Sequence, residues 1–421
     1  MYLKIFNKHQ LIKIFFLLIF INYSFFSIRH SLRENPWIAG DWLMNYEAGI
    51  LRRGLSGEII LLLSNISSIN PTYLVIFFQI SLYCFFLYFF IQILNKKTIN
   101  IWFLFLLLSP ATIAFTFYDP LVIGRKEVIF FTFYTIYISI FLNDLKISVF
   151  KIIFYFSIGF IFVLIHEIFI FFSLFFVFTK YFSIYKKNIK IKINYFLNEL
   201  SLIFGSFIAF LILLFFSTNE PEVQDLVCNR LLNNGLTPEI CKGALTEIVF
   251  SKYVNSYKSF GLIDYILSYN YLRTYLISLI LFFLPLYIFL LKQKINKKQI
   301  KLFSIFIIIQ LIFLVSIFVV VNDWGRYLNI YFILILVFVS NFFLRKNLQE
   351  LKKFNYKNLL IVLILLLYSL SWHMPHCCQK NLGKGMVSFK ERILYRINNP
   401  TNYNDFSRKV ILKFLGVNEH N

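Results

Sequence analysis

Long apolar runs decide what this chain can fold into. The segments YLVIFFQISLYCFFLYFFIQIL (73–94) and SIFIIIQLIFLVSIFVVV (304–321) contain no charged residue. A helix of this length crosses about 30 Å of hydrocarbon, and inside lipid it satisfies its backbone amides within the segment. The runs lack the alternating polarity of membrane β-strands. Since 59% of the 421 residues are hydrophobic, above the share usual in soluble domains, we predict an all-α, polytopic integral membrane helical bundle.

The lysines set the expected topology. The net charge is +22, and most of the lysines lie in short loops between apolar runs, where they obey the positive-inside rule. This distribution gives no reason to expect nucleic acid as a partner. With the lysine-rich loops and the N-terminus in the cytoplasm, the sequence predicts about eleven transmembrane helices. They cover 10–28, 73–94, 101–117, 128–143, 148–182 as two spans, 197–217, 272–291, 302–321, 328–344 and 358–372.

One of these runs has two interpretations. Residues 148–182 are almost entirely apolar, with His166 and Glu167 near the middle. Lysines precede and follow the run, which favours a hairpin with these two residues at its outer tip. A single tilted span is the alternative, and it would place five lysines outside.

The organisation expected from this topology is simple. Residues 1–372 form the transmembrane bundle, with outer-face loops at 29–57, 118–127, 218–270 and 322–327. Residues 373–421 form an external tail with the basic and apolar spacing of an amphipathic surface helix. The bias toward isoleucine, lysine, asparagine and phenylalanine suggests an AT-rich bacterial genome, and hence the inner (plasma) membrane.

Four charged knots interrupt the apolar chain. They are NYEAGILRRGLSGE (45–58), YDPLVIGRKEVIFF (118–131), IHEIF (165–169) and NDWGRYL (322–328). The topology places all four on the outer face, where they could converge. Ionisable groups at membrane depth usually face a bundle interior or an aqueous cavity and are functional. Each knot also has a structural alternative, namely snorkelling arginines, a helix-terminal carboxylate or a local ion pair.

The residue types in the knots favour group transfer. Arginine keeps its charge and its planar fork fits a phosphate or diphosphate, while a carboxylate or histidine could remove a proton from a hydroxyl. The candidate catalytic residues are Asp41, Glu47 and His166, which the sequence does not rank. The candidate substrate-binding residues are Arg52, Arg53, Arg125, Lys126, Glu167, Asp323 and Arg326.

The cysteines point to a disulfide. Cys228 and Cys241 lie in the large outer loop, where an oxidising compartment favours a bond between them. Cys377 and Cys378 lie beside His373 and His376, but adjacent cysteines rarely form a tetrahedral zinc site together, so we predict no metal site. The chain lacks a P-loop, a GxSxG elbow, an HExxH pair and a dinucleotide fingerprint, which argues against an ATPase, a serine hydrolase, a zincin or a Rossmann enzyme. We predict no cofactor.

The topology and the outer-face arginines Arg52, Arg53, Arg125 and Arg326 resemble those of bacterial surface-polysaccharide enzymes of the O-antigen polymerase class. More loosely, Asp41 and Glu47 in the first outer loop resemble the acidic residues of GT-C glycosyltransferases with lipid-linked donors, although no DxD or ExD doublet is present. The resemblance implies a glycosyl-transferring enzyme that acts at the outer face on a polyprenyl-diphosphate-linked glycan. It also implies contact with membrane lipid and with polysaccharide-assembly proteins.

Two other classes of function stay open at this point. A transporter or flippase of a lipid-linked glycan would need charges along a path between the two faces. A non-catalytic membrane assembly subunit would use the knots as interfacial ion pairs.

Overall fold

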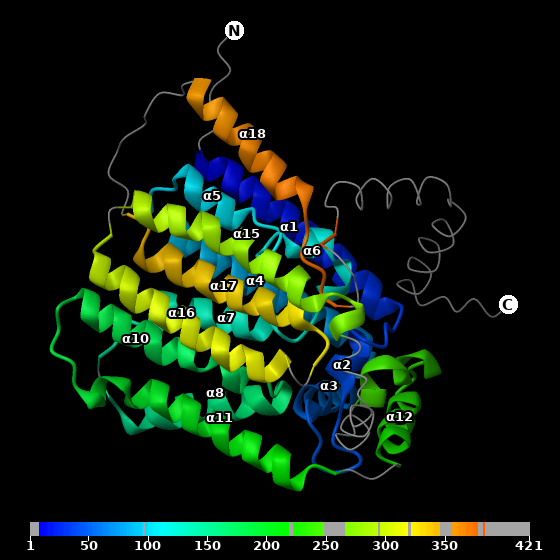
Figure 1. Ribbon diagram of the computed structural model, residues 1–421. Helices are drawn as coiled ribbons and strands as arrows, with labels where there is room; N and C mark the ends of the chain where they lie inside the picture. The colour runs from blue at the N-terminus through cyan, green and yellow to red at the C-terminus, as the bar shows by residue number, and fades with distance from the viewer. Residues whose placement is uncertain are drawn as a thin grey trace, which may run out of the picture.

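The computed structural model describes residues 8–95, 97–145, 147–218, 222–247, 266–293, 295–318, 321–345, 356–377 and 382–383. Within these ranges the chain is helical and contains no β-strand beyond one isolated bridge between His373 and Gly383. The predicted all-α helical bundle is therefore confirmed (Figure 1).

The long helices run side by side through the molecule (Figure 1). Seven helical segments in the described ranges are long and apolar enough to cross a membrane. They comprise α1 (Lys8–Leu32), α4 (Pro71–Asn95), α9 and α10 (Phe169–Phe172 and Leu174–Lys186), α11 (Leu197–Phe216), α15 (Tyr271–Lys292), α16 (Lys297–Phe318) and α17 (Trp324–Phe342). Shorter apolar helices accompany them, namely α3 (Gly54–Ser67), α7 (Val128–Ile136), α8 (Val149–Ile165) and α18 (Tyr356–Ser371).

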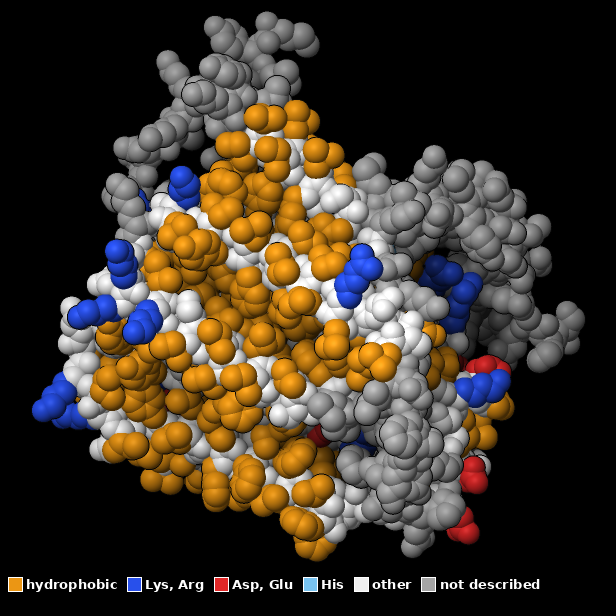
Figure 2. All heavy atoms as spheres, viewed as in Figure 1, with side chains coloured by type: hydrophobic (Ala, Val, Ile, Leu, Met, Phe, Trp, Pro, Cys, Tyr) orange, Lys and Arg blue, Asp and Glu red, His pale blue; other side chains and the backbone are white. Residues whose placement is uncertain are grey.

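One end of the bundle gathers the lysine-rich loops, and we call it the lysine end. Lys97 Nζ donates to Asn341 O at 2.6 Å and Lys186 donates to Phe342 O, so both loops meet the C-terminal end of α17. Hydrophobic side chains cover the middle of the face in Figure 2, and basic side chains line one edge of it. The exposed lysines of this end include Lys187, Lys190, Lys192, Lys292, Lys297 and Lys298.

The opposite end carries the short helices, and we call it the α2 end (Figure 1). Its elements are α2 (Ala39–Leu43), α3, α6 (Phe115–Tyr118), η1 (Pro120–Val122), α12 (Val223–Asn233), η4 (Pro238–Cys241) and η5 (Gly243–Glu247). Cys228 and Cys241 form the predicted disulfide, with their Cα atoms 5.5 Å apart. The bond joins α12 to η4. The predicted amphipathic helix of the tail lies outside the described residues.

The expected continuous span at 101–117 is wrong. Helix α5 (Ile101–Leu107) stops in the interior of the bundle, and only the single turn of α6 follows. Pro110 explains the interruption, because it has no backbone N–H and disfavours a helical conformation at Ser109 before it. The non-helical stretch is almost wholly buried, so its backbone polar groups need partners inside the protein.

Residues 148–182 form two helical arms. Helix α8 ends at Ile165, with His166 as its C-cap, and α9 and α10 return along the bundle. Lys180 of α10 donates to Asp144 O at 2.5 Å, beside the start of α8, so both arms begin and finish at the lysine end. The structure therefore has the hairpin and places His166 and Glu167 at the α2 end.

Helices α8 and α11 pack in close contact through glycine. A Cβ atom on Gly159 would lie 2.1 Å from Leu202 O, and one on Gly205 would lie 2.2 Å from Phe156 O. Small residues let membrane helices approach at backbone distance. This contact fixes the hairpin against the rest of the bundle.

Candidate functional site

All four charged knots meet at the α2 end. Arg53, at the N-terminus of α3, forms a bidentate ion pair with Glu167, which lies in the turn between α8 and α9. Its Nε lies 3.0 Å from Oε2 and its Nη2 lies 2.8 Å from Oε1. The Nη1 of Arg53 lies 3.3 Å from Asp41 Oδ1 on α2. Arg52 also approaches Glu167, at 3.8 Å.

A second group of charges lies beside the first. Arg326, in the first turn of α17, pairs with Asp323 and with Glu127, which precedes α7. His166 lies between the two groups, with Nε2 3.8 Å from Glu127 Oε1 and Nδ1 3.6 Å from Glu167 Oε2. Residues that are far apart in the sequence thus form one continuous charged cluster.

Two cations of the cluster are held by backbone carbonyls instead of carboxylates. Lys126 is fully buried, and its Nζ donates to Arg53 O at 2.9 Å and to Ile165 O at 3.4 Å. Arg125 is 8% exposed and donates to Leu121 O at 3.3 Å and to Trp37 O. No carboxylate of a described residue lies within ion-pair distance of Arg125. Its guanidinium therefore feels Asp323, Asp41 and Glu127 only at longer range and has no direct carboxylate contact among the described residues.

Among the described residues of the cluster, cations outnumber carboxylates. Five cations face four carboxylates there, and burial keeps His166 neutral. The cations are Arg52, Arg53, Arg125, Lys126 and Arg326, and the carboxylates are Asp41, Glu127, Glu167 and Asp323. Burying an uncompensated charge is costly. An anion that bound beside Arg125 would supply a direct counter-charge.

The pKa values explain these protonation states. Burial alone would raise the pKa of Asp41, but Lys126 and Arg53 outweigh it and hold this pKa far below its ordinary value. Burial likewise opposes ionisation of Glu167, yet Arg53 keeps its pKa well below normal. Burial lowers the pKa of Lys126 to about 8. Burial, and then Arg53, lowers the pKa of His166 to about 4, so His166 stays neutral.

A cavity of about 390 Å³ opens beside the cluster. Four arginines line it, and the remaining walls come from the loop before α2, the segment before α17, η5 and the chain after α18. Such a volume is typical of small-molecule sites. The polar and charged lining residues are Asn35, Arg52, Arg53, Arg125, Asn322, Asp323, Arg326, Tyr327 and His376.

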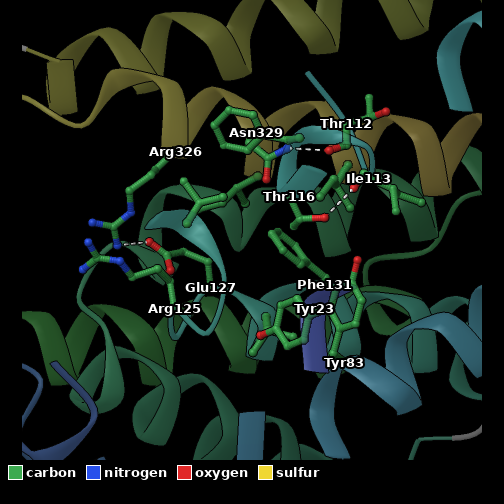
Figure 3. A pocket seen from close by; sticks show the side chains of 15 residues that line it. Tyr23, Tyr83, Thr112, Ile113, Thr116, Arg125, Glu127, Phe131, Arg326 and Asn329 are labelled. Atoms are coloured by element: carbon green, nitrogen blue, oxygen red, sulfur yellow. Dashed lines mark hydrogen bonds and ion pairs between the residues drawn. The ribbon is translucent and has the colours of Figure 1, made fainter. Parts of the chain in front are cut away.

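A smaller cavity of about 40 Å³ lies on the other side of the same charges. Figure 3 shows Arg125, Glu127 and Arg326 at one edge of it. Across the cavity, Asn329 Nδ2 donates to the Ala111 and Thr112 carbonyls at 2.9 Å each, which satisfies backbone groups freed where α5 stops. The cluster therefore borders a partly polar space inside the bundle.

The predicted site residues divide into those that line the large cavity, those that belong only to the cluster, and Glu47. The arginines Arg52, Arg53, Arg125 and Arg326, together with Asp323, line the large cavity. Four others belong to the cluster but not to that lining, namely Asp41, Lys126, His166 and Glu167.

Glu47 lies apart from the cluster. Its side chain is 49% exposed and pairs with Arg230 of α12 at 3.4 Å, and Arg230 also pairs with Glu58 at 2.7 Å. These three residues join α12 to the loop before α3 and to α3 itself. Their ion pairs hold the disulfide-linked segment of α12 and η4 in place, and they do not line the large cavity.

Sequence reasoning missed one pair. His376 lines the large cavity, and its Nδ1 lies 2.5 Å from Asp119 Oδ2. Asp119 stands in the second charged knot, and His376 lies in WHMPHCC after the last span. In the sequence, only the predicted placement of that knot and of the C-terminal tail on the same face pointed toward the contact.

The described residues contain no group of three or more His, Cys, Asp or Glu side chains arranged to hold a metal ion. Comparison with protein-family models, curated proteins and solved structures finds no match for this chain.

Proposed function

We propose that this protein is a membrane enzyme that transfers glycosyl groups from a polyprenyl-diphosphate-linked donor at the outer face of a bacterial inner membrane. The observation that carries the proposal is the cavity lined by four arginines, in which Arg125 has no carboxylate partner among the described residues. The cavity lies at one end of a bundle of apolar helices, where the head group of a membrane-embedded substrate would lie.

The arginines suit a diphosphate leaving group. When the bond between the sugar and the diphosphate breaks, negative charge builds up on the diphosphate, and preorganised cations stabilise that charge. Arg125 is the best candidate for the primary contact because its guanidinium is not committed to a carboxylate. Arg53 and Arg326 are already paired with carboxylates, so their guanidinium groups are held rigidly in the wall of the cavity by their own partners.

The orientation in the membrane follows from the charges. If the lysine end faces the cytoplasm, as the positive-inside rule requires, then the cavity and the disulfide both face the outer side. A cysteine introduced as Asn234→Cys should then react with an impermeant maleimide in spheroplasts, whereas one introduced as Lys187→Cys should react only after lysis. The reverse labelling pattern would place the site in the cytoplasm and refute the proposed donor side.

The function is tested by the surface glycan. Cells that lack the gene, and cells that carry Arg125→Ala, should both lose long chains or one sugar in an electrophoretic profile of the glycan. Arg230→Ala is the matched control, because Arg230 lies at the same end but does not line the cavity. An unchanged profile in the deletion strain would refute glycosyl transfer and leave transport of another substrate, or assembly, to be tested.

A binding experiment tests the site without knowledge of the sugar. Purified protein in detergent should bind inorganic diphosphate, and Arg125→Ala should weaken that binding by about 10- to 100-fold. This range follows because a hydrogen bond to a charged group contributes about 1.5–3 kcal/mol. Equal binding by the Arg125 and Arg230 variants would show that the cavity does not recognise the anion.

A further inference from the structure

The cavity contains a histidine oriented by a carboxylate. Asp119 Oδ2 lies 2.5 Å from His376 Nδ1 and also accepts the backbone N–H of His376 at 3.1 Å. The other carboxylate oxygen of Asp119 accepts the backbone N–H of Leu121 at 3.2 Å. Asp119 is 5% exposed. The carboxylate is thus held from both sides and can hold the imidazole in one orientation.

The fold brings this pair together from distant parts of the chain. After α18 the chain turns back across the N-terminal end of α17, where Gly325 N donates to His376 O at 3.0 Å. Tyr275 of α15 donates to Pro375 O at 3.3 Å. Gly325 permits the crossing, because a Cβ atom there would lie 1.9 Å from Pro375 O. The position of His376 is therefore fixed by the packing of α15, α17 and the segment that follows α18.

The geometry assigns different tasks to the two ring nitrogens. An Asp carboxylate beside Nδ1 favours the tautomer in which Nδ1 carries the proton and Nε2 has the free lone pair. Nε2 makes no hydrogen bond to another described residue, and His376 lines the cavity. Asp323, the carboxylate in that lining, is already paired with Arg326. Among the described residues that line the cavity, His376 is therefore an ionisable side chain that is still available to accept a proton.

We propose that His376 is the general base of the reaction and that Asp119 is its positioning residue. This inference rests on the proposed glycosyl transfer. The acceptor hydroxyl oxygen forms a bond to the anomeric carbon while its proton moves to His376 Nε2. The bond between that carbon and the diphosphate oxygen breaks, and the polyprenyl diphosphate leaves with the electron pair beside Arg125. His376 then releases the proton to water.

The first experiment uses chemical rescue in cells. His376→Ala should lower glycan formation by about 10²- to 10⁴-fold, the usual contribution of a general base, and imidazole in the medium should restore part of it. His376→Gln should be equally impaired without rescue, because its side chain fills the space. His30→Gln is the matched control. His30 lies at the same end, 3.2 Å from Pro120 O, but does not line the cavity.

The second experiment separates positioning from folding. Asp119→Asn should lower glycan formation strongly, because the amide can donate to Nδ1 and favour the wrong tautomer. The double variant Asp119→Asn, His376→Ala should respond to imidazole as His376→Ala does, since free imidazole needs no orienting carboxylate. A purely structural role for Asp119 predicts no rescue of the double variant, and that result would refute the positioning role.

Inorganic diphosphate distinguishes the two proposals. The His376 variants should bind it as the wild type does while glycan formation fails, because Arg125 is intact. If the deletion strain and Arg125→Ala lose glycan but His376→Ala and His376→Gln retain it, the general-base assignment is wrong and the function stands. If His376→Ala is inactive, present in the membrane and able to bind diphosphate, yet is not rescued by imidazole, the assignment is also refuted. An unchanged glycan in the deletion strain refutes the function itself.

Discussion

Removing Arg326 should destabilise the protein mainly through the carboxylate that it leaves behind. Glu127 is 4% exposed, and its Oε2 has no hydrogen bond in the described structure. Both side chains of the pair are nearly inaccessible, at 5% and 6%. Breaking a buried ion pair from one side costs about 3–5 kcal/mol, so we expect Arg326→Ala to lower the free energy of unfolding by this amount.

A double variant tests the cause of that loss. Adding Glu127→Gln to Arg326→Ala replaces an uncompensated charge with a neutral amide, whose unsatisfied burial costs about 1–3 kcal/mol. The double variant should therefore be more stable than Arg326→Ala alone. Unfolding in mixed detergent micelles can be followed by tryptophan fluorescence, because Trp42 and Trp324 are buried at the same end.

The control is Arg230→Ala. The carboxylate partners of Arg230 are 49% and 34% exposed, and such surface pairs contribute about 0–1 kcal/mol. If the losses in unfolding free energy from Arg326→Ala and Glu127→Gln add up to that of the double variant within about 0.5 kcal/mol, the two charges are not coupled. That result would refute the ion pair as the cause of the loss. It also follows that loss of activity in Arg326→Ala alone cannot separate substrate binding from stability, whereas Arg125→Ala can.

Three further predictions concern stability. Because the pKa of His166 is lowered to about 4 by burial, the unfolded chain takes up a proton that the folded chain does not between about pH 6.5 and 4. The free energy of unfolding should therefore fall as the pH is lowered through this range, and His166→Gln should flatten that fall. The pKa of Lys126 is lowered to about 8, so wild-type stability should rise by about 3 kcal/mol, relative to Lys126→Met, between about pH 8 and 10.5. A pH-independent difference between those two proteins would contradict the burial of a charged lysine. Removing the disulfide by Cys228→Ser, whose partner is 13 residues away, should cost about 3 kcal/mol and expose the α12 segment to limited proteolysis. Equal proteolysis with and without the bond would show that the ion pairs of Arg230 hold the segment.

Much of the fold could be predicted because hydropathy and charge are properties of short stretches of sequence. The apolar runs indicated membrane helices, the lysines indicated which loops share an end, and the flanking lysines indicated the hairpin at His166 and Glu167. The prediction of one continuous span at 101–117 was wrong because hydropathy does not detect the interruption of the helix at Pro110. The carbonyls freed there are satisfied by Asn329 of α17, a partner more than two hundred residues away.

The candidate site was only partly predictable. The topology predicted that Arg52, Arg53, Arg125 and Arg326 share one end of the bundle, and these arginines do line one cavity. Their partners did not follow, because which carboxylate meets which guanidinium depends on the rotation and tilt of each helix. Glu47 illustrates the limit, since it shares a loop with the arginines and yet pairs with α12.

The sequence by itself determined that the helices are apolar enough for a membrane, that the fold is all-helical and that the lysine-rich loops share one end. It also identified the two cysteines that could form a disulfide. These properties depend on composition and spacing along the chain. Only the tertiary structure decided that Arg125 lacks a carboxylate and that His376 reaches Asp119. Both depend on distances of a few ångströms between side chains from different helices, and such distances arise only once the whole bundle has packed.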